Sequence, residues 1–225
     1  MYAIIRNGLV LGTTDELNYI KVHETNGCFV QDKSNNPQGI AFMSTAYNIL
    51  GTNGIGCLES VEVREVDANT LEQMPKFDYL AEAVDKKSAE LSAACGDAIT
   101  SGIDYNGKHY SLTASDQTNI DSMFNSIVLG ADSFPYHADG EECSVMDAQS
   151  IIGLYMAYKT HVTYQTTYFN MLKAQIMTYT EPNEVYIVRY GDELNNTYKA
   201  KMQEMLTAAQ TQMTTIVNKL TGGEA

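Results

Sequence analysis

Hydrophobic and polar positions along the chain change their period at about residue 77. Before that point, residues 61–66 alternate with a period of two, which is typical of a half-buried strand. After Pro75, apolar residues recur at steps of three and four, which is typical of an amphipathic helix. The pattern predicts an α+β protein, with a small β-rich domain over residues 1–72 and a helical module over residues 77–225.

Short apolar runs separated by turn residues mark the β-rich domain. Asn7-Gly8 lies between apolar runs at 2–5 and 9–11, and an Asn-Gly turn of this kind is a strong signal for a β-hairpin. Further strands are predicted at 28–30 and 40–42, each after a turn that contains glycine. The glycines within residues 50–58 are in the wrong order for a nucleotide-binding loop, so we expect an ordinary loop there.

The helical module begins with a helix, a hairpin and a second helix. Apolar positions over residues 77–99 lie on one helical face. The turn at Asn106-Gly107 predicts a hairpin over about residues 103–112. Thr113 and Asp116 then have the spacing of a capping box, so we expect a helix that continues to about residue 129.

The same arrangement recurs once along the chain. Asp139-Gly140 predicts the turn of a second hairpin, over about residues 136–143. Ser144 and Asp147 have the spacing of another capping box before a long helix. We expect the two hairpins to lie near each other.

The long helix carries apolar residues at the spacing of a coiled-coil seam over about four heptads. Additional apolar residues widen this face, so the helix could pack inside a bundle or pair with a copy of itself. A β-rich run follows at 185–190, and a final helix begins near Asp192 with methionines on its apolar face. The candidate interaction face comprises Ile151, Tyr155, Tyr158, Val162, Phe169, Leu172, Ile176, Met202, Met205 and Met213.

Charge and composition restrict the partners. The formal net charge is −14, so nucleic acid and anionic membranes would be repelled by the average surface. No stretch approaches the roughly 18 apolar residues of a membrane span, and we expect neither a span nor a secretion signal. Four dispersed cysteines, without a C-x-x-C pair, favour free buried thiols: Cys28, Cys57, Cys95 and Cys143.

One short segment contains several possible metal ligands. His137, Asp139 and Glu141 lie close together in sequence, followed by Glu142 and Cys143. Their spacing does not match zinc or calcium loops, and a turn explains Asp139-Gly140, so these residues are weak metal candidates. No motif pairs a nucleophile with a base. We therefore expect neither a cofactor nor enzymatic activity.

Residues 77–178 resemble a known type of domain. The run from Gly102 to Thr113 followed by Asp116-Gln117, then residues 136–140, then a helix ending in Leu172–Ile176, is similar to an uncharacterised domain of tail-fibre-associated and baseplate proteins of bacteriophages and prophages. The order of the elements and the Gly-x-x-Tyr-x-Gly-x-x-Tyr core carry the resemblance.

The resemblance implies a non-catalytic structural or adaptor component of a phage tail, baseplate or tail fibre, or of a tail-like particle. Such a protein would be assembled in the host cytoplasm, reside in the virion tail, form a homo-oligomer and contact other tail proteins. Two alternatives remain: a tail-fibre assembly chaperone, and a receptor- or carbohydrate-binding module of the tail tip.

Overall fold

The protein is an α+β protein that divides into two compact units, residues 1–83 and 84–225. The computed structural model describes residues 1–14, 20–23, 29–31, 47–49, 61–220 and 222. The strand predicted at 40–42, the loop at 50–58, and Cys28 and Cys57 lie outside the described residues.

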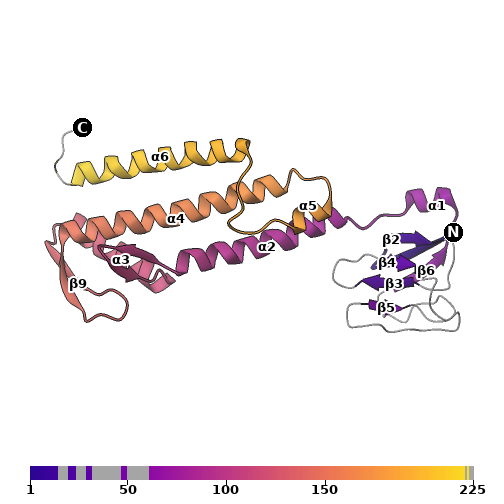
Figure 1. The fold of residues 1–225 in the computed structure, drawn as a ribbon, viewed down its shortest axis with the longest axis horizontal. Helices are drawn as coiled ribbons and strands as arrows, with labels where there is room; N and C mark the ends of the chain where they lie inside the picture. Colours follow the sequence, from indigo (N-terminus) through magenta and orange to yellow (C-terminus); the bar gives the residue numbers. More distant parts are fainter. Residues whose placement is uncertain (15–19, 24–28, 32–46, 50–60, 221, 223–225) are drawn as a thin grey trace. The chain divides into compact units, whose positions relative to one another are not determined.

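The first unit contains two small antiparallel sheets (Figure 1). One has the order β2-β1-β6, from β1 (Tyr2–Arg6), β2 (Leu9–Thr14) and β6 (Val61–Glu65). Asn7 and Gly8 both have positive φ angles, at 50° and 79°, which confirms the predicted Asn-Gly hairpin. The other sheet has the order β4-β3-β5, from β3 (Ile20–His23), β4 (Phe29–Gln31) and β5 (Tyr47–Ile49).

A short helix and the segment after it complete the core of this unit. Ala3, Ile5 and Val10 are buried against Val66, with partly buried side chains from the following segment. Helix α1 (Ala68–Gln73), which the periodicity did not predict, begins where the Asp67 carboxylate accepts a hydrogen bond from Thr70 N. The backbone of Val10 bonds to Pro75 O and Phe77 N, so the unit continues past residue 72, where the sequence placed the end of the β-rich domain.

The second unit is built around the long helix α4. Helices α2 and α6 run along it in Figure 1, and α3 packs against its first half. The ring of His161 on α4 lies 2.9 Å from the Ala98 carbonyl of α2, which fixes these two helices to each other. The helices of this unit are α2 (Tyr79–Thr100), which begins within the first unit, α3 (Ala114–Val128), α4 (Ala148–Ile176), α5 (Pro182–Tyr186) and α6 (Asn196–Leu220).

The first predicted hairpin and its capping box are confirmed. Strands β7 (Ile103–Tyr105) and β8 (Lys108–Tyr110) flank Asn106-Gly107, and Thr113 and Asp116 form the capping box of α3. Gly102 joins α2 to the hairpin with φ +93°, at a point where a Cβ would lie 2.3 Å from the Tyr110 carbonyl oxygen. Only glycine fits this position without displacing the hairpin.

The second hairpin differs from the prediction. Its strands are β9 (Ser133–Tyr136) and β10 (Ser144–Asp147), and residues 137–143 form the loop between them rather than the strands. A turn does occur at Asp139-Gly140, but this loop folds against the first hairpin, because Asp139 N donates to the His109 carbonyl. The two hairpins therefore do lie together, as expected.

The predicted start of α4 is wrong by three residues. Ser144 belongs to strand β10, and the N-cap is Asp147, whose carboxylate accepts from Ser150 N at 2.7 Å. Asp147 was expected to be the acidic partner of the box, but its own side chain provides the cap.

The β-rich run predicted at 185–190 is also wrong. Pro182 opens the short helix α5, and the Glu184 carboxylate accepts hydrogen bonds from the backbone N–H groups of Thr180 and Glu181. The buried side chains Val185 and Val188 are three residues apart, which suits a helical turn and not a strand.

Hydrophobic side chains from β8, α3 and α4, and from the segments that follow the strands β8 and β9, form the core of the second unit. Tyr155 of α4 stacks on Phe124 of α3 with ring centroids 3.7 Å apart. The cluster of buried residues comprises Tyr110, Leu112, Ile120, Met123, Ala138, Ile151, Leu154 and Tyr158.

Candidate functional site: the α4–α6 helix pair

Helix α6 packs on α4 through one face only. Met202 is buried, and Leu206, Ala209, Met213 and Val217 are half-buried at steps of three and four residues. The remaining positions from residue 203 to 219 are exposed. A helix that covers one neighbour leaves most of its circumference available for another contact.

The connection before α6 is held firmly against α4. The Tyr168 hydroxyl donates to Asp192 O at 2.6 Å and accepts from Gly191 N at 2.9 Å. The buried amide of Gln175 accepts from Asn195 N at 2.9 Å. Asn195 in turn accepts from the N–H groups of Thr197 and Tyr198, so α6 begins at residue 196 and not near Asp192. These contacts hold the segment before α6 against α4 and so fix the direction in which α6 runs along α4.

The exposed surface of α6 is unusually poor in charge. Residues 205–218 contain no charged side chain, although the chain as a whole carries −14. Helices α4 and α6 contain one acidic residue, Glu204, and five lysines: Lys159, Lys173, Lys199, Lys201 and Lys219. The net charge of the two helices is therefore +4, and the net charge of the rest of the chain is −18. Solvated helices normally carry charges on the outer face, so this stretch has the composition of a contact surface.

Threonine hydroxyls on α6 are satisfied within the helix. Thr207, Thr211, Thr214 and Thr215 each donate to the carbonyl four residues earlier, at 2.8 to 2.9 Å. The bond uses the only hydroxyl proton of each side chain. These hydroxyl groups therefore need no hydrogen-bond acceptor from water or from a partner protein.

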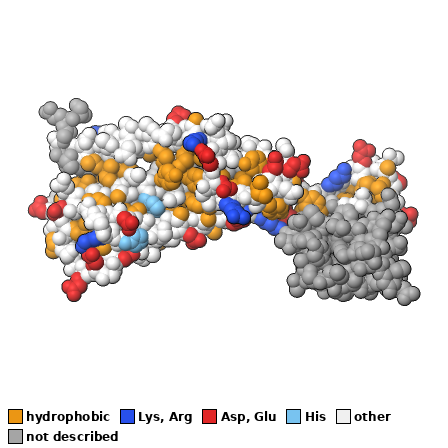
Figure 2. All heavy atoms as spheres, viewed as in Figure 1, with side chains coloured by type: hydrophobic (Ala, Val, Ile, Leu, Met, Phe, Trp, Pro, Cys, Tyr) orange, Lys and Arg blue, Asp and Glu red, His pale blue; other side chains and the backbone are white. Residues whose placement is uncertain are grey.

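Two open grooves run beside the line of contact between α4 and α6. The larger, of about 540 Å³, is lined by uncharged side chains that include Thr160 and Tyr164 of α4 and Gln203 of α6. The smaller, of about 230 Å³, is lined by Tyr155 and Lys159 of α4 and by Ile216 of α6. Figure 2 shows hydrophobic side chains gathered along α4 and α6 on the face that it presents.

Lys159 is held in the wall of the smaller groove. Its ammonium lies 2.8 Å from the Asp121 carboxylate of α3 and 3.1 Å from the Tyr158 hydroxyl. Partial burial lowers the pKa of Lys159, but the hydrogen bonds to Asp121 and Tyr158 outweigh it and leave the pKa above its ordinary value. Lys159 therefore stays positively charged in the wall of the groove, where it is paired with Asp121.

The predicted interaction face is divided between the core and the surface. Ile151, Tyr158, Leu172, Ile176 and Met202 are buried within this chain. Tyr155, Val162, Phe169 and Met213 are half-buried. Among the ten predicted residues, Met205 is the exposed one, with 52% of its surface accessible. Ile216, which is 51% exposed, was missing from that face, although the uncharged stretch around it is visible in the sequence.

The weak metal candidates do not converge on a common point. Asp139 accepts from Ser111 N at 3.1 Å and from the Ser111 hydroxyl, and the hydroxyl bond is the main cause of a lowered pKa at Asp139. Glu141 forms an ion pair with Lys108, and His137 Nδ1 lies against the Ala138 carbonyl. Within the described ranges, no group of three potential ligands is arranged to hold a metal ion.

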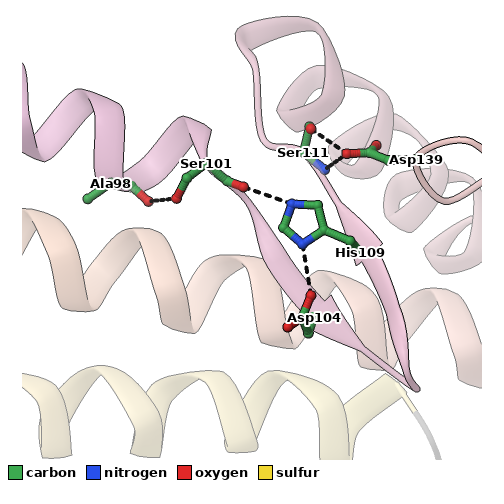
Figure 3. Close-up of polar contacts among 6 residues, drawn as sticks. All are labelled: Ala98, Ser101, Asp104, His109, Ser111 and Asp139. Carbon is green, nitrogen blue, oxygen red and sulfur yellow. Dashed lines mark hydrogen bonds and ion pairs between the residues drawn. The ribbon is translucent and has the colours of Figure 1, made fainter.

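His109 connects the first hairpin to the end of α2 (Figure 3). Nδ1 lies 2.8 Å from the Asp104 carboxylate and Nε2 lies 2.8 Å from the Ser101 carbonyl. The hydrogen bond to Asp104 raises the pKa of His109, desolvation opposes this, and the Ser101 carbonyl reinforces it. Only the imidazolium can donate to both acceptors.

A serine, a histidine and an aspartate thus meet here without the geometry of a catalytic triad. The Ser101 hydroxyl donates to the Ala98 carbonyl at 2.9 Å, and it is the Ser101 carbonyl oxygen that faces the imidazole. In a triad the histidine must reach the hydroxyl to accept its proton. This set of residues ties the hairpin to the helix.

The cysteines differ from each other in burial. Cys95 is buried, and its thiol lies 3.5 Å from the Gln165 carbonyl of α4. Cys143, in the loop between β9 and β10, is exposed, which corrects the prediction of a buried thiol there. Both are free.

Residues 82–192 match the family model of a domain of unknown function (DUF4376). This region begins in α2 and stops before α6, which starts at residue 196. No curated protein and no solved structure matches the chain. Among the described residues, no helix has the length and apolar character needed to cross a membrane.

Proposed function

We propose that this protein is a non-catalytic structural or adaptor component of a phage tail, baseplate or tail fibre, or of a phage tail-like particle, and that it works through protein–protein contacts. The observation that carries the proposal is the uncharged outer surface of α6, with Met205 and Ile216 exposed on a chain that is otherwise strongly acidic. Exposed apolar side chains in a charge-poor surface are typical of protein interfaces.

The resemblance of residues 77–178 to a domain of tail-fibre-associated and baseplate proteins supports the same function. The structural roles of the residues that carry the resemblance also support this function. Gly102 makes a close backbone approach, Tyr110 is buried, and Asn106-Gly107 forms the turn. Tyr105 packs against α4, because a Cβ at Gly153 would lie 2.1 Å from its hydroxyl. The motif thus specifies a scaffold, which suits a protein that assembles with others.

The test is whether the protein remains in finished particles. Particles purified from producing cells on a density gradient should contain this chain, in a copy number that follows the symmetry of a tail structure. Quantitative mass spectrometry of the particle and of the cell lysate measures it. A chain abundant in the cells and absent from the particles would contradict the structural function and favour the assembly chaperone.

The groove of about 540 Å³ favours carbohydrate binding as a second candidate function. Hydroxyl and amide side chains line it, together with Tyr164, which is half-exposed. Such side chains can bind sugar hydroxyls, and an exposed aromatic ring can pack on a sugar face. Binding of isolated host cell-wall glycans that is lost in Tyr164→Ala and kept in Met205→Ala would support this function.

A further inference from the structure

A stripe of four residues on α6 has the spacing of a helix–helix seam. Met205, Ala209, Gln212 and Ile216 follow steps of four, three and four, and at about 100° per residue they fall within roughly 60° of the helix circumference. Met205 and Ile216, at its two ends, are both about half exposed. Ala209, Gln212 and Ile216 of the stripe line the groove of about 230 Å³. The stripe shares Ala209 with the line of contact with α4, whereas Met205, Gln212 and Ile216 are exposed beside that line.

We propose that a second copy of this chain docks along this stripe, with the two α6 helices antiparallel about a twofold axis between residues 210 and 211. In this arrangement Met205 of one chain faces Ile216 of the other, and Ala209 faces Gln212. Each of these contacts occurs twice by symmetry. The surface is therefore its own complement, as a twofold interface requires.

Charges at the ends of the stripe complement each other in the same arrangement. Glu204 and Lys219 are exposed, and neither forms an ion pair within the part of the chain that the structure describes. Both lie on the same flank of the stripe. In the antiparallel pair, Glu204 of one chain and Lys219 of the other are about 3 Å apart along the helix axis, so two ion pairs form per dimer.

Electrostatics also limits where two copies can meet. Two chains with −14 each repel over most of their surface, whereas residues 205–218 carry no charge and add no repulsion between two copies. Threonine hydroxyls bonded within α6 further reduce the desolvation required. The alternative is that a different protein binds this stripe, and a measurement of self-association separates the two cases.

The first experiment measures the molar mass of the full chain by analytical ultracentrifugation over a range of concentrations. We expect a monomer–dimer equilibrium, with at least a tenfold weaker association for Met205→Lys/Ile216→Lys. Gln210→Lys/Thr214→Lys is the matched control, since it adds the same charge on exposed positions of the opposite side of α6 and should leave association within about twofold. Circular dichroism verifies that both variants retain the helices.

The second experiment tests the antiparallel direction by exchanging charges. Glu204→Lys alone and Lys219→Glu alone should each weaken the dimer by roughly tenfold, because each places like charges opposite one another twice. The double variant Glu204→Lys/Lys219→Glu should return to within about twofold of the original. Single variants without effect, or a double variant weaker than either, would overturn the antiparallel dimer.

Dimer formation itself does not depend on the proposed function. Only the assignment of the dimer to particle assembly rests on the proposed function. A chain that is monomeric at all concentrations overturns the inference. If that monomer is still incorporated into particles, and Met205→Lys/Ile216→Lys abolishes incorporation, a different protein occupies the stripe and the proposed function stands. A dimer that is absent from particles supports the inference and contradicts the proposed function.

Discussion

Helices α4 and α6 carry similar heptad spacing, but they use it differently. The α4 seam is largely buried in the core of its own chain, through Ile151, Tyr158, Leu172 and Ile176. On α6, one line of apolar residues packs on α4, and three residues of the stripe stay exposed: Met205, Gln212 and Ile216. Periodicity identifies an apolar face, but what covers that face depends on neighbours far away in the sequence.

The largest contrast between the two helices should appear when one side chain is truncated in each. Leu172→Ala removes a fully buried side chain and should lower the free energy of unfolding by about 2–5 kcal/mol. Ile216→Ala removes a half-exposed one and should cost less than about 1 kcal/mol. Urea unfolding followed by circular dichroism, at concentrations where the chain is monomeric, measures both. Equal losses would place the two residues in equivalent environments.

A close contact on α4 gives a smaller effect. Gly153→Ala would place its Cβ 2.1 Å from the Tyr105 hydroxyl, so the Tyr105 ring must move from its place against α4, at about 1–3 kcal/mol. Gly191→Ala is a poor control because of its positive φ, whereas Gly96, on α2, has open space and no positive φ. Gly96→Ala should therefore be neutral or stabilising. A loss at Gly153 that persists in a Tyr105→Ala background would contradict this contact.

The start of α4 should depend on Asp147 and not on Ser144. Asp147→Ala removes the carboxylate that accepts from Ser150 N and should cost about 1 kcal/mol of unfolding free energy. Ser144→Ala, at an exposed position in β10, is the control and should change little. The reverse order of the two variants would restore the cap predicted from sequence.

The smallest effect is the pH dependence from His109. Its pKa in the folded protein is raised by Asp104, so its contribution to stability is complete below the ordinary pKa of 6.5 and is lost as pH rises through the raised pKa. His109→Asn should remove this part of the pH dependence. Melting temperatures of both proteins from pH 5 to pH 9 measure it, and identical profiles would show that the imidazolium contributes nothing.

Local signals in the sequence predicted much of the fold. Asn7-Gly8 and Asn106-Gly107 specify turns by residues that accept positive φ, and Thr113 with Asp116 specifies a helix start. These features succeed because their chemistry is complete within a few residues. The same signals failed at Ser144, where strand pairing with Tyr136 took the place of a helix cap.

The candidate site was less predictable, because it depends on contacts between distant segments. Nothing near Tyr168 or Gln175 in sequence indicates that they hold the segment 191–195 and so direct α6 along α4. Asp139 looked like a metal ligand because its partner Ser111 lies 28 residues earlier. The uncharged run 205–218 was visible in the sequence, but only the packing shows which of its residues remain exposed.

Hydrogen exchange of α4 and α6 as a function of protein concentration tests the contrast between the two helices most directly. We predict that amides of α4 around Leu154 and Leu172 are protected equally at all concentrations, because its seam is buried within the chain. Protection of α6 over residues 205–216 should rise with concentration as the dimer forms. Protection in α6 that is independent of concentration, or in α4 that rises with it, would contradict this account.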